Sequence, residues 1–325
     1  MAIIIRGTGK ALPEKKMKNT DFPASLETSD EWIHKHTGIS ARYIAGEDDC
    51  SHLLATAACR RALENIQASS DPAATQQPVA AADIDVIICA TVTGTYKGFP
   101  SNACLIQNEL SAPHAACFDV LAGCSGFLYG LDIAASMLTK HSWRYALVCG
   151  SEILSRILDW NDRSTCVLFG DGAGAVLLEN TATDARQIGI QSAILGADGS
   201  GGLDLYLDKK NHVQMNGHSV YNFAVHCITE TIQNLLQKES LTLDDIDLFV
   251  CHQANWRILD AAAKRLKCDP AKFASNIEDY GNTSSASIPI ALDDFFCKGQ
   301  LHKGMTIILA GFGAGLTWGG CVIRL

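Results

Sequence analysis

The chain has 325 residues, of which 47% are hydrophobic and 19% charged, so it is long and apolar enough to bury a large core and is not a disordered chain. The net charge of −9 is spread along the sequence, and nucleic acid is an unsuitable ligand because phosphate binding requires a basic surface. Neither a membrane span, which needs ~18 apolar residues, nor a signal peptide is predicted.

Thirteen cysteines are present, but none forms a C-x-x-C pair and their spacing is irregular. Most lie in apolar segments, such as Cys89 and Cys149, where a free cysteine behaves as a small hydrophobic residue. We therefore expect a reduced, cytoplasmic protein. No set of histidine, cysteine and carboxylate residues has zinc-binding spacing, so no metal site is predicted.

The first half of the chain alternates between strands and helices. A capping box with Thr28 at the cap and Glu31 three residues later predicts a short helix that carries Trp32. A polar loop is expected over 68–81. Apolar, β-branched runs and Leu/Ala-rich segments predict the remaining elements: strands at 3–5, 86–92, 117–120, 146–150 and 175–179, and helices at 52–66 and 125–140.

The second half repeats this pattern. The segment 83–89, DIDVIIC, is echoed by DIDLFVC at 245–251, and strands expected at 306–310 and 319–325 follow in the same order as in the first half. The repeat predicts an α/β fold of two pseudo-symmetric halves, 1–180 and 181–325, with mixed, mostly parallel central sheets covered by helices. Equivalent loops of two such halves meet where the halves join.

Cys124 differs from the other cysteines in its local setting. It follows a predicted strand and the small residues Ala122 and Gly123, directly before a helix that begins at about Ser125. A helix N-terminus lowers the pKa of a thiol and favours the thiolate, so Cys124 is the candidate nucleophile. Without this setting, a structural role would be the better interpretation of any single cysteine.

The repeat places two polar residues of the second half near this cysteine. His252 follows the strand 245–251, and the carboxyl edge of a parallel strand faces the crevice in which such folds bind ligands. A strand predicted at 272–275 corresponds to the strand before Cys124, so Asn282 should lie opposite Cys124. A histidine satisfied within a loop and an asparagine helix cap are the alternative interpretations.

A glycine-dense segment, 311–315, lets the backbone pass close to a ligand. Its N–H groups, including that of Ala314, can stabilise an oxyanion. The alternative is a plain turn between two strands.

Together these segments resemble the β-ketoacyl-acyl carrier protein synthase III family of the thiolase superfamily. The resemblance extends over almost the whole chain, from TSDEW at 28–32 to GFGAGLTWG at 311–319, and its most specific parts are HQAN at 252–255 and YGNTSSAS at 280–287. It implies the thiolase-like duplicated fold, with the nucleophile in the first half and its partners in the second.

The resemblance also implies a two-step reaction. The Cys124 thiolate would take the acyl group from an acyl thioester, usually acyl-CoA, with the backbone N–H groups of Cys124 and Ala314 as an oxyanion hole. Malonyl-acyl carrier protein would then lose CO₂, with its enolate stabilised by hydrogen bonds from His252 and Asn282, and attack the acyl group. Coenzyme A thioester is a substrate in this scheme, and no tightly bound cofactor is expected.

Further positions match residues that bind substrates or partners in the family. Phe99 matches a residue that reaches into the acyl pocket of a partner subunit, which implies a homodimer. The sequence departs from the family pattern near the substrate entrance, where the donor would bind, at His36, His218, Tyr221 and Asn222. The resemblance assigns CoA binding to Thr28, Trp32, Arg163 and Asn255, and docking of the acidic carrier protein to Arg257, Lys264 and Arg265; an ordinary solvated helix face is the alternative for the last three.

Initiation of type II fatty acid synthesis is the leading interpretation. The same chemistry in a polyketide or alkylquinolone pathway is a close alternative that the sequence does not distinguish. A catalytically silent carrier-binding partner would be expected to lack the nucleophile, and a Cys-His-Asn hydrolase would lack the duplicated architecture.

Overall fold

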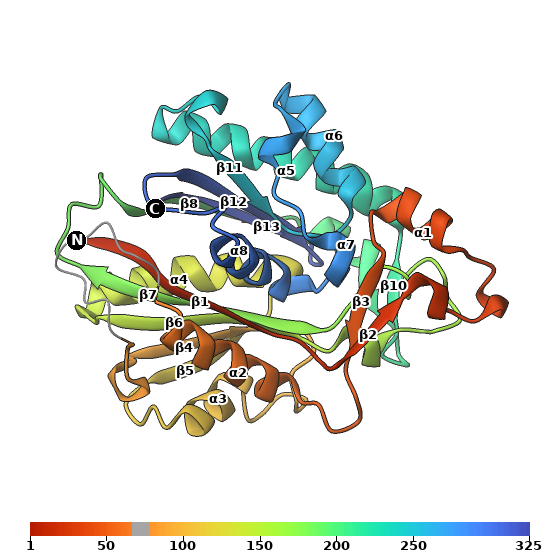
Figure 1. The fold of residues 1–325 in the computed structure, drawn as a ribbon, viewed down its shortest axis with the longest axis horizontal. Helices are drawn as coiled ribbons and strands as arrows, with labels where there is room; N and C mark the ends of the chain where they lie inside the picture. The colour runs from red at the N-terminus through yellow and green to blue at the C-terminus, as the bar shows by residue number, and fades with distance from the viewer. Residues whose placement is uncertain (67–77) are drawn as a thin grey trace.

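The computed structural model describes residues 1–66 and 78–325, so residues 68–77 of the expected polar loop lie outside the described residues. Two sheets and three helical layers are stacked alternately (Figure 1). Strands in such a stack are buried on both faces, which is why their sequences are continuous apolar runs. The helices are α2 (Ser51–Glu64) and α3 (Asn102–Leu110) outside the first sheet, α4 (Gly126–His141) and α8 (Ser287–Cys297) between the sheets, and α5 (Gly217–Glu239) and α6 (Trp256–Leu266) outside the second.

The first sheet contains five strands from the first half of the chain. Its central strands run parallel, β4 pairing with both β5 and β6, whereas β7 pairs antiparallel with β6 and with β1. The parallel strands are joined through helices, as a parallel connection requires. In sheet order the strands are β1 (Ala2–Ala11), β7 (Gly172–Thr181), β6 (Tyr145–Glu152), β4 (Val86–Ala90) and β5 (Ala116–Val120).

The second sheet repeats part of this arrangement. Strands β11 and β12 are parallel, and β13 pairs antiparallel with both β12 and β8. The domain boundary predicted near residue 180 stays a prediction; the two sheets are connected by the chain between Thr181 and Gly189. In sheet order the strands are β11 (Leu248–Cys251), β12 (Thr306–Gly313), β13 (Thr317–Arg324) and β8 (Gly189–Ala197).

The strand predicted at 272–275 is wrong as a strand, although its place in the repeat is correct. Only a single parallel bridge joins Phe273 to Phe249 of β11, and Ala274 donates its N–H to the Phe249 carbonyl at 2.9 Å. The 3-10 turn Pro270–Lys272 directly before it leaves too little extended chain for a ladder. The two phenylalanine rings stack with centroids 4.8 Å apart, so packing holds the segment beside β11.

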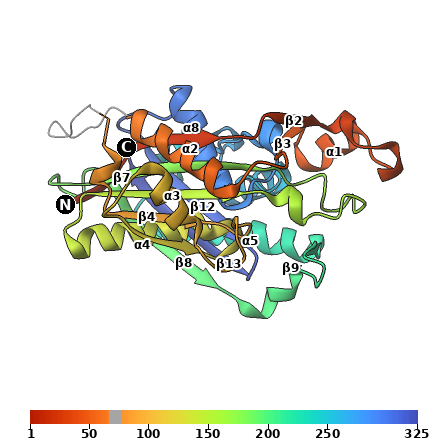
Figure 2. The same cartoon turned by 90° about the horizontal axis from the view of Figure 1, so that it is seen from below.

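The cap of α1 (Asp30–Thr37) lies one residue later than predicted. Ser29, and not Thr28, is the N-cap, and its hydroxyl accepts the Trp32 N–H at 3.1 Å. The helix lies at the end of the molecule away from both termini, and the hairpin that contains β9 lies at the same end (Figure 2). The remaining elements near this end are β2 (Lys15–Lys18), β3 (Ala41–Ile44), α7 (Ile277–Tyr280), β9 (Leu205–Leu207) and β10 (Val213–Met215).

One hydrophobic core joins the two halves. Helices α4 and α8 fill the middle layer, and fully buried side chains from both sheets, among them Val148 and Leu309, belong to the same cluster. A buried ionic contact also crosses the join, because Lys10 of β1 pairs with Asp294 of α8. No helix among residues 1–66 and 78–325 is long and apolar enough to cross a membrane.

Candidate active site

Cys124 lies where β5 leads into α4. The 3-10 turn Gly123–Ser125 runs directly into the helix, so the cysteine occupies the helix start that the sequence predicted. Its thiol is buried, and burial raises its pKa to about 12, although the neighbouring Ser284 hydroxyl opposes the rise. The expectation of a lowered pKa is therefore wrong for the free protein, because desolvation outweighs the helix N-terminus.

The backbones of the two halves meet at this cysteine. A Cβ atom on Gly313 would lie 2.4 Å from the Cys124 nitrogen, and one on Gly123 would lie 2.7 Å from the Ala314 nitrogen. Gly123 also has a φ of +53°, which L side chains rarely adopt. Glycine at both positions thus brings the N–H groups of Cys124 and Ala314 close together, as a backbone oxyanion hole requires.

His252 follows β11 and is fixed by a hydroxyl group. Its Nδ1 lies 2.7 Å from the Ser287 Oγ, which itself accepts the Gln253 N–H at 3.3 Å. Because that N–H already donates to the Ser287 oxygen, we assign the hydroxyl hydrogen to Nδ1 and the ring proton to Nε2. Burial lowers the pKa of His252 to about 3, so the ring is neutral near pH 7. The edge-on ring of Phe312, 5.2 Å away, adds to this apolar setting.

The Nε2–H of His252 is the important group in this arrangement. Nε2 is buried and has no hydrogen-bond partner among the described residues. An unpaired buried donor carries a free-energy cost, and here it lines the same cavity as Cys124. A hydrogen-bond acceptor on a ligand would satisfy it.

Asn282 is fixed by the opposite half of the chain. Its backbone N–H donates to the Leu168 carbonyl at 2.8 Å, and its carbonyl accepts the Gly170 N–H at 3.0 Å. The side-chain oxygen accepts the Ser284 N–H at 2.8 Å, while the Nδ2 group has no partner within the described part of the chain. The amide therefore offers a second neutral donor to the cavity that Cys124 and His252 line.

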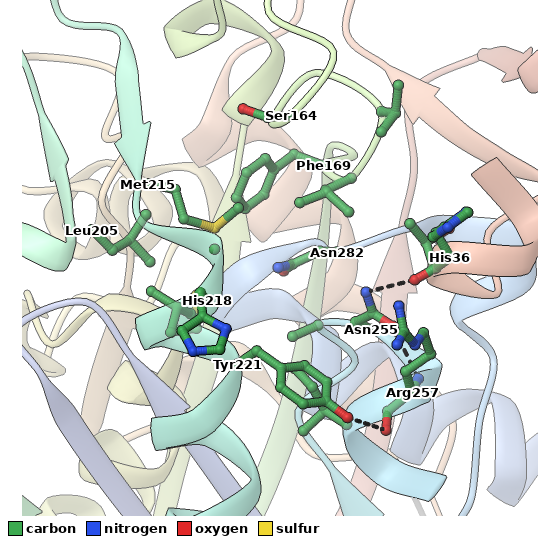
Figure 3. A pocket seen from close by; sticks show the side chains of 18 of the residues that line it. His36, Ser164, Phe169, Leu205, Met215, His218, Tyr221, Asn255, Arg257 and Asn282 are labelled. Carbon is green, nitrogen blue, oxygen red and sulfur yellow. Dashed lines mark hydrogen bonds between the residues drawn. The ribbon is translucent and has the colours of Figure 1, made fainter. Parts of the chain in front are cut away.

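Two cavities meet at Cys124. The larger, about 500 Å³, contains Cys124, His252 and Asn282 in its wall and is shown in Figure 3. The smaller, about 330 Å³, also reaches the sulfur and is mainly apolar. Its wall includes Val92, Leu154, Ile157, Leu205, Val213, Ser284 and Ala314.

Four of the predicted binding residues lie on the larger cavity: Trp32, Arg163, Asn255 and Arg257. The Arg163 guanidinium lies 5.3 Å from the Trp32 ring centroid and donates to the Glu27 carbonyl at 2.6 Å. Asn255 caps α6 by accepting the Arg257 N–H at 2.9 Å, and donates to the His36 carbonyl at 3.1 Å (Figure 3). Thr28 does not line the cavity, but its buried hydroxyl has no partner among the described residues.

The other predicted binding residues lie elsewhere. Phe99 is 88% exposed and lines neither cavity of its own chain. Lys264 pairs with Asp260 at 2.7 Å on the exposed face of α6, and Arg265 lies beside it. The four positions that depart from the family pattern all line the larger cavity: His36, His218, Tyr221 and Asn222.

Three residues that lie behind the site were not predicted from the sequence. Ser287 orients His252, and Ser284 connects Asn282 to a buried carboxylate, Glu152. Glu152 had a usable signal, since a charged residue ends the otherwise apolar strand β6 at its carboxyl edge. No group of three or more His, Cys, Asp or Glu residues within 1–66 and 78–325 is arranged to hold a metal ion.

Similar solved structures define the class of this protein. The 3-oxoacyl-[acyl-carrier-protein] synthase III from Aquifex aeolicus has a TM-score of 0.92 and 39% identity, over 99% of this chain and 100% of that one. The priming β-ketosynthase of the R1128 polyketide pathway has a TM-score of 0.90 and 32% identity, over 100% of this chain and 96% of that one. The fold is that of a thiolase-like condensing enzyme.

Sequence comparisons assign the family within this class. Family models for 3-oxoacyl-[acyl-carrier-protein] synthase III and for its C-terminal part match residues 118–199 and 236–325. The β-ketoacyl-[acyl-carrier-protein] synthase III of Bacillus pumilus is 45% identical over 320 residues, 98% of each chain. The chain belongs to the β-ketoacyl-[acyl-carrier-protein] synthase III family, whose members are transferases of fatty acid biosynthesis.

Replacing Ser287 with alanine tests the assigned tautomer. Without the hydroxyl donor at Nδ1, we expect the population with the proton on Nε2 to fall several-fold, since one such hydrogen bond contributes about 0.5–1.5 kcal/mol. Long-range ¹H–¹⁵N correlation NMR of the His252 ring would measure the two tautomers. Ser285→Ala is the control, because the Ser285 hydroxyl hydrogen-bonds Glu152 and not the His252 ring. An unchanged tautomer ratio in Ser287→Ala would contradict the assignment.

Proposed function

We propose that the chain catalyses the decarboxylative Claisen condensation of an acyl thioester, acyl-CoA, with malonyl-acyl carrier protein, as the initiating step of type II fatty acid synthesis. The observation that carries this proposal is the pair of unpaired neutral donors, His252 Nε2–H and the Asn282 amide, in one cavity with Cys124. Such donors stabilise a developing enolate oxygen without protonating it.

In the first step Cys124 attacks the thioester carbonyl. The N–H groups of Cys124 and Ala314 receive the negative charge on the carbonyl oxygen, and the thiol of coenzyme A leaves. The acyl group then remains on the sulfur. The apolar cavity beside Cys124, about 330 Å³ in volume, supports this step because it offers the acyl chain a surface away from water.

In the second step the malonyl thioester carbonyl accepts hydrogen bonds from His252 and Asn282. Loss of CO₂ leaves an enolate, whose carbon attacks the acyl carbonyl; the carbon–sulfur bond to Cys124 breaks and the β-ketoacyl product forms. The pKa of about 3 for His252 supports its role as a neutral donor, because an imidazolium would protonate the enolate more readily.

The larger cavity offers a binding site for the coenzyme A part of the donor. Trp32 supplies a flat aromatic surface for the adenine ring, and Arg163 and Asn255 supply donors from the cavity wall, while Thr28, outside the wall, would need a local rearrangement to bring its unpaired hydroxyl to the ligand. For the carrier protein we propose the face of α6 with Arg257, Lys264 and Arg265. These three side chains form a positively charged face on a chain whose net charge is −9, and this supports recognition of an acidic partner there.

We further propose a homodimer in which Phe99 of each subunit reaches the other subunit. Phe99 and Leu121 are large apolar side chains at 88% and 78% exposure near β5, the edge strand of its sheet, and a partner subunit would remove their surface from water. Sedimentation equilibrium of the purified chain should give twice its 34.8 kDa mass. A Phe99→Ala chain that dimerises equally well would point to other contacts, and a monomeric wild type would refute the proposal.

All thirteen cysteines are unpaired, and this supports a reducing compartment such as the cytoplasm.

A starter role in a polyketide pathway is the second candidate function. It is favoured by the likeness to the R1128 priming β-ketosynthase, which covers 100% of this chain. The two functions share every step above and differ in the acyl group that is loaded.

Replacing Cys124 with alanine should abolish formation of a covalent acyl adduct, because no other group at the site can hold the acyl chain. Intact-protein mass spectrometry after incubation with acyl-CoAs from acetyl to long and branched chains would measure the adduct. The preferred chain in the wild type separates a fatty-acid starter from a specialised one. Trp32→Ala serves as a matched variant that should need more donor for the same adduct. An adduct of equal size in Cys124→Ala would refute the nucleophile.

Replacing Asn282 with alanine should slow condensation about 10²–10³-fold while changing acylation little, because its amide acts on the malonyl enolate and not on the acyl donor. Single-turnover acylation by acyl-CoA and turnover with malonyl-acyl carrier protein would be measured separately. Equal losses in the two half-reactions would contradict this division of roles.

A further inference from the structure

Glu152 is a buried carboxylate that the reaction described above does not use. It ends β6 and is 0% exposed. Its oxygens accept hydrogen bonds from the hydroxyls of Thr93 at 2.5 Å, Ser285 at 2.7 Å and Ser284 at 3.2 Å, and from the backbone N–H of Val92 at 3.1 Å. All of these groups donate hydrogen bonds to Glu152, and this fits the ionised form of the carboxylate, because that form has only acceptors. Within the described residues no cation pairs with it.

Ser284 connects this carboxylate to the nucleophile. Its hydroxyl donates to Glu152 at 3.2 Å, the 3-10 turns that contain Ser284 and Cys124 pack against each other, and both residues line the apolar cavity. Ser284 has a φ of +50°, in the left-handed region. The other non-glycine residues with a positive φ end helices or lie in a hairpin turn, whereas Ser284 begins the 3-10 turn Ser284–Ala286. Backbone strain of this kind is characteristic of functional positions.

The nucleophile needs a proton acceptor that His252 does not provide. Ser287 places the ring proton on Nε2, so the nitrogen that faces the cavity has no lone pair to offer. Ionising Cys124 by loss of the proton to solvent would leave two buried negative charges, the thiolate and Glu152. Passing the proton to Glu152 leaves only one.

We propose that Glu152 is a positioning residue for acylation, which holds the Ser284 hydroxyl against Cys124 and takes up the thiol proton through it. The proton moves from sulfur to the Ser284 oxygen while the Ser284 proton moves to Glu152. The thiolate then forms its bond to the acyl carbon, the bond to the coenzyme A sulfur breaks, and the proton returns through Ser284 to the leaving thiolate. The acylation step of this inference rests on the proposed function.

The charge of Glu152 raises the pKa of two titratable groups, which are Cys124 before α4 and Cys89 in β4. Residues 91–93 and 284–285 contribute only neutral donors. Burial raises the pKa of Glu152, and its charge raises the pKa of Cys124. Simple repulsion therefore predicts a more reactive thiol when the charge is removed, whereas the proton transfer that we propose predicts a less reactive one.

Alkylation of Cys124 by iodoacetamide tests the inference without any substrate. The rate would be followed by peptide mass spectrometry between about pH 4 and pH 9, a range that includes the ordinary pKa of a glutamate and the values above it. In the wild type, the rate should fall as the pH falls through the raised pKa of Glu152 and level off above it. In Glu152→Gln and in Ser284→Ala, the rate at pH 7 should fall about 10²-fold and rise steadily with pH, because hydroxide replaces the carboxylate as acceptor.

Ser285→Ala is the matched control, since it removes a hydroxyl from the same carboxylate without breaking the path to Cys124. Its rate should stay within a few-fold of the wild type, and Glu152→Asp should restore part of the lost rate. Ser284→Ala decides the matter if Glu152→Gln does not fold, as judged by thermal unfolding. Equal or faster alkylation in Glu152→Gln or Ser284→Ala would overturn the inference. The expected alkylation pattern in a chain that no acyl-CoA acylates would instead refute the proposed function alone.

Discussion

Two backbone segments, one from each half of the chain, approach beside Cys124 so closely that neither carries a side chain at the contact. Gly123 precedes Cys124 and Gly313 ends β12, and a Cβ atom on either would lie within 2.7 Å of a backbone nitrogen of the opposite segment. A third contact of this kind joins Gly150 of β6 to the carbonyl of Ser285, at 2.2 Å from a notional Cβ. These contacts set the distance between the halves, and every functional group of the site is positioned relative to them.

Burial then decides the protonation states at this contact. Desolvation favours the neutral form of each group, so it lowers the pKa of His252 and raises those of Cys124 and Glu152. A neutral histidine is suited to donating a hydrogen bond, but a neutral thiol is a poor nucleophile. In the reaction that we propose, the same apolar environment would support stabilisation of the enolate and hinder attack by the thiol, and for this reason we propose a local proton acceptor for Cys124.

The sequence predicted the parts of the molecule that depend on local pattern. Buried apolar runs located β4, β6 and β12, and the repeat brought His252 and Asn282 to the cavity that contains Cys124. It did not predict the thiol pKa, because the N-terminus of α4 is visible in the sequence whereas the desolvation by residues far along the chain is not. Ser287 was missed for the same reason, since its role depends on a contact with a residue 35 positions away.

The shared core between the sheets has a consequence for how the protein is made. Helix α4 is synthesised with the first half, yet it packs against β12 and β13, and α8 packs against β1 and β7. Until the ribosome has released the last strands, the apolar face of the first sheet that α8 covers has no partner. The nascent chain therefore exposes an apolar surface during most of translation. The yield of folded protein in the cell should depend on chaperones that shield such surfaces.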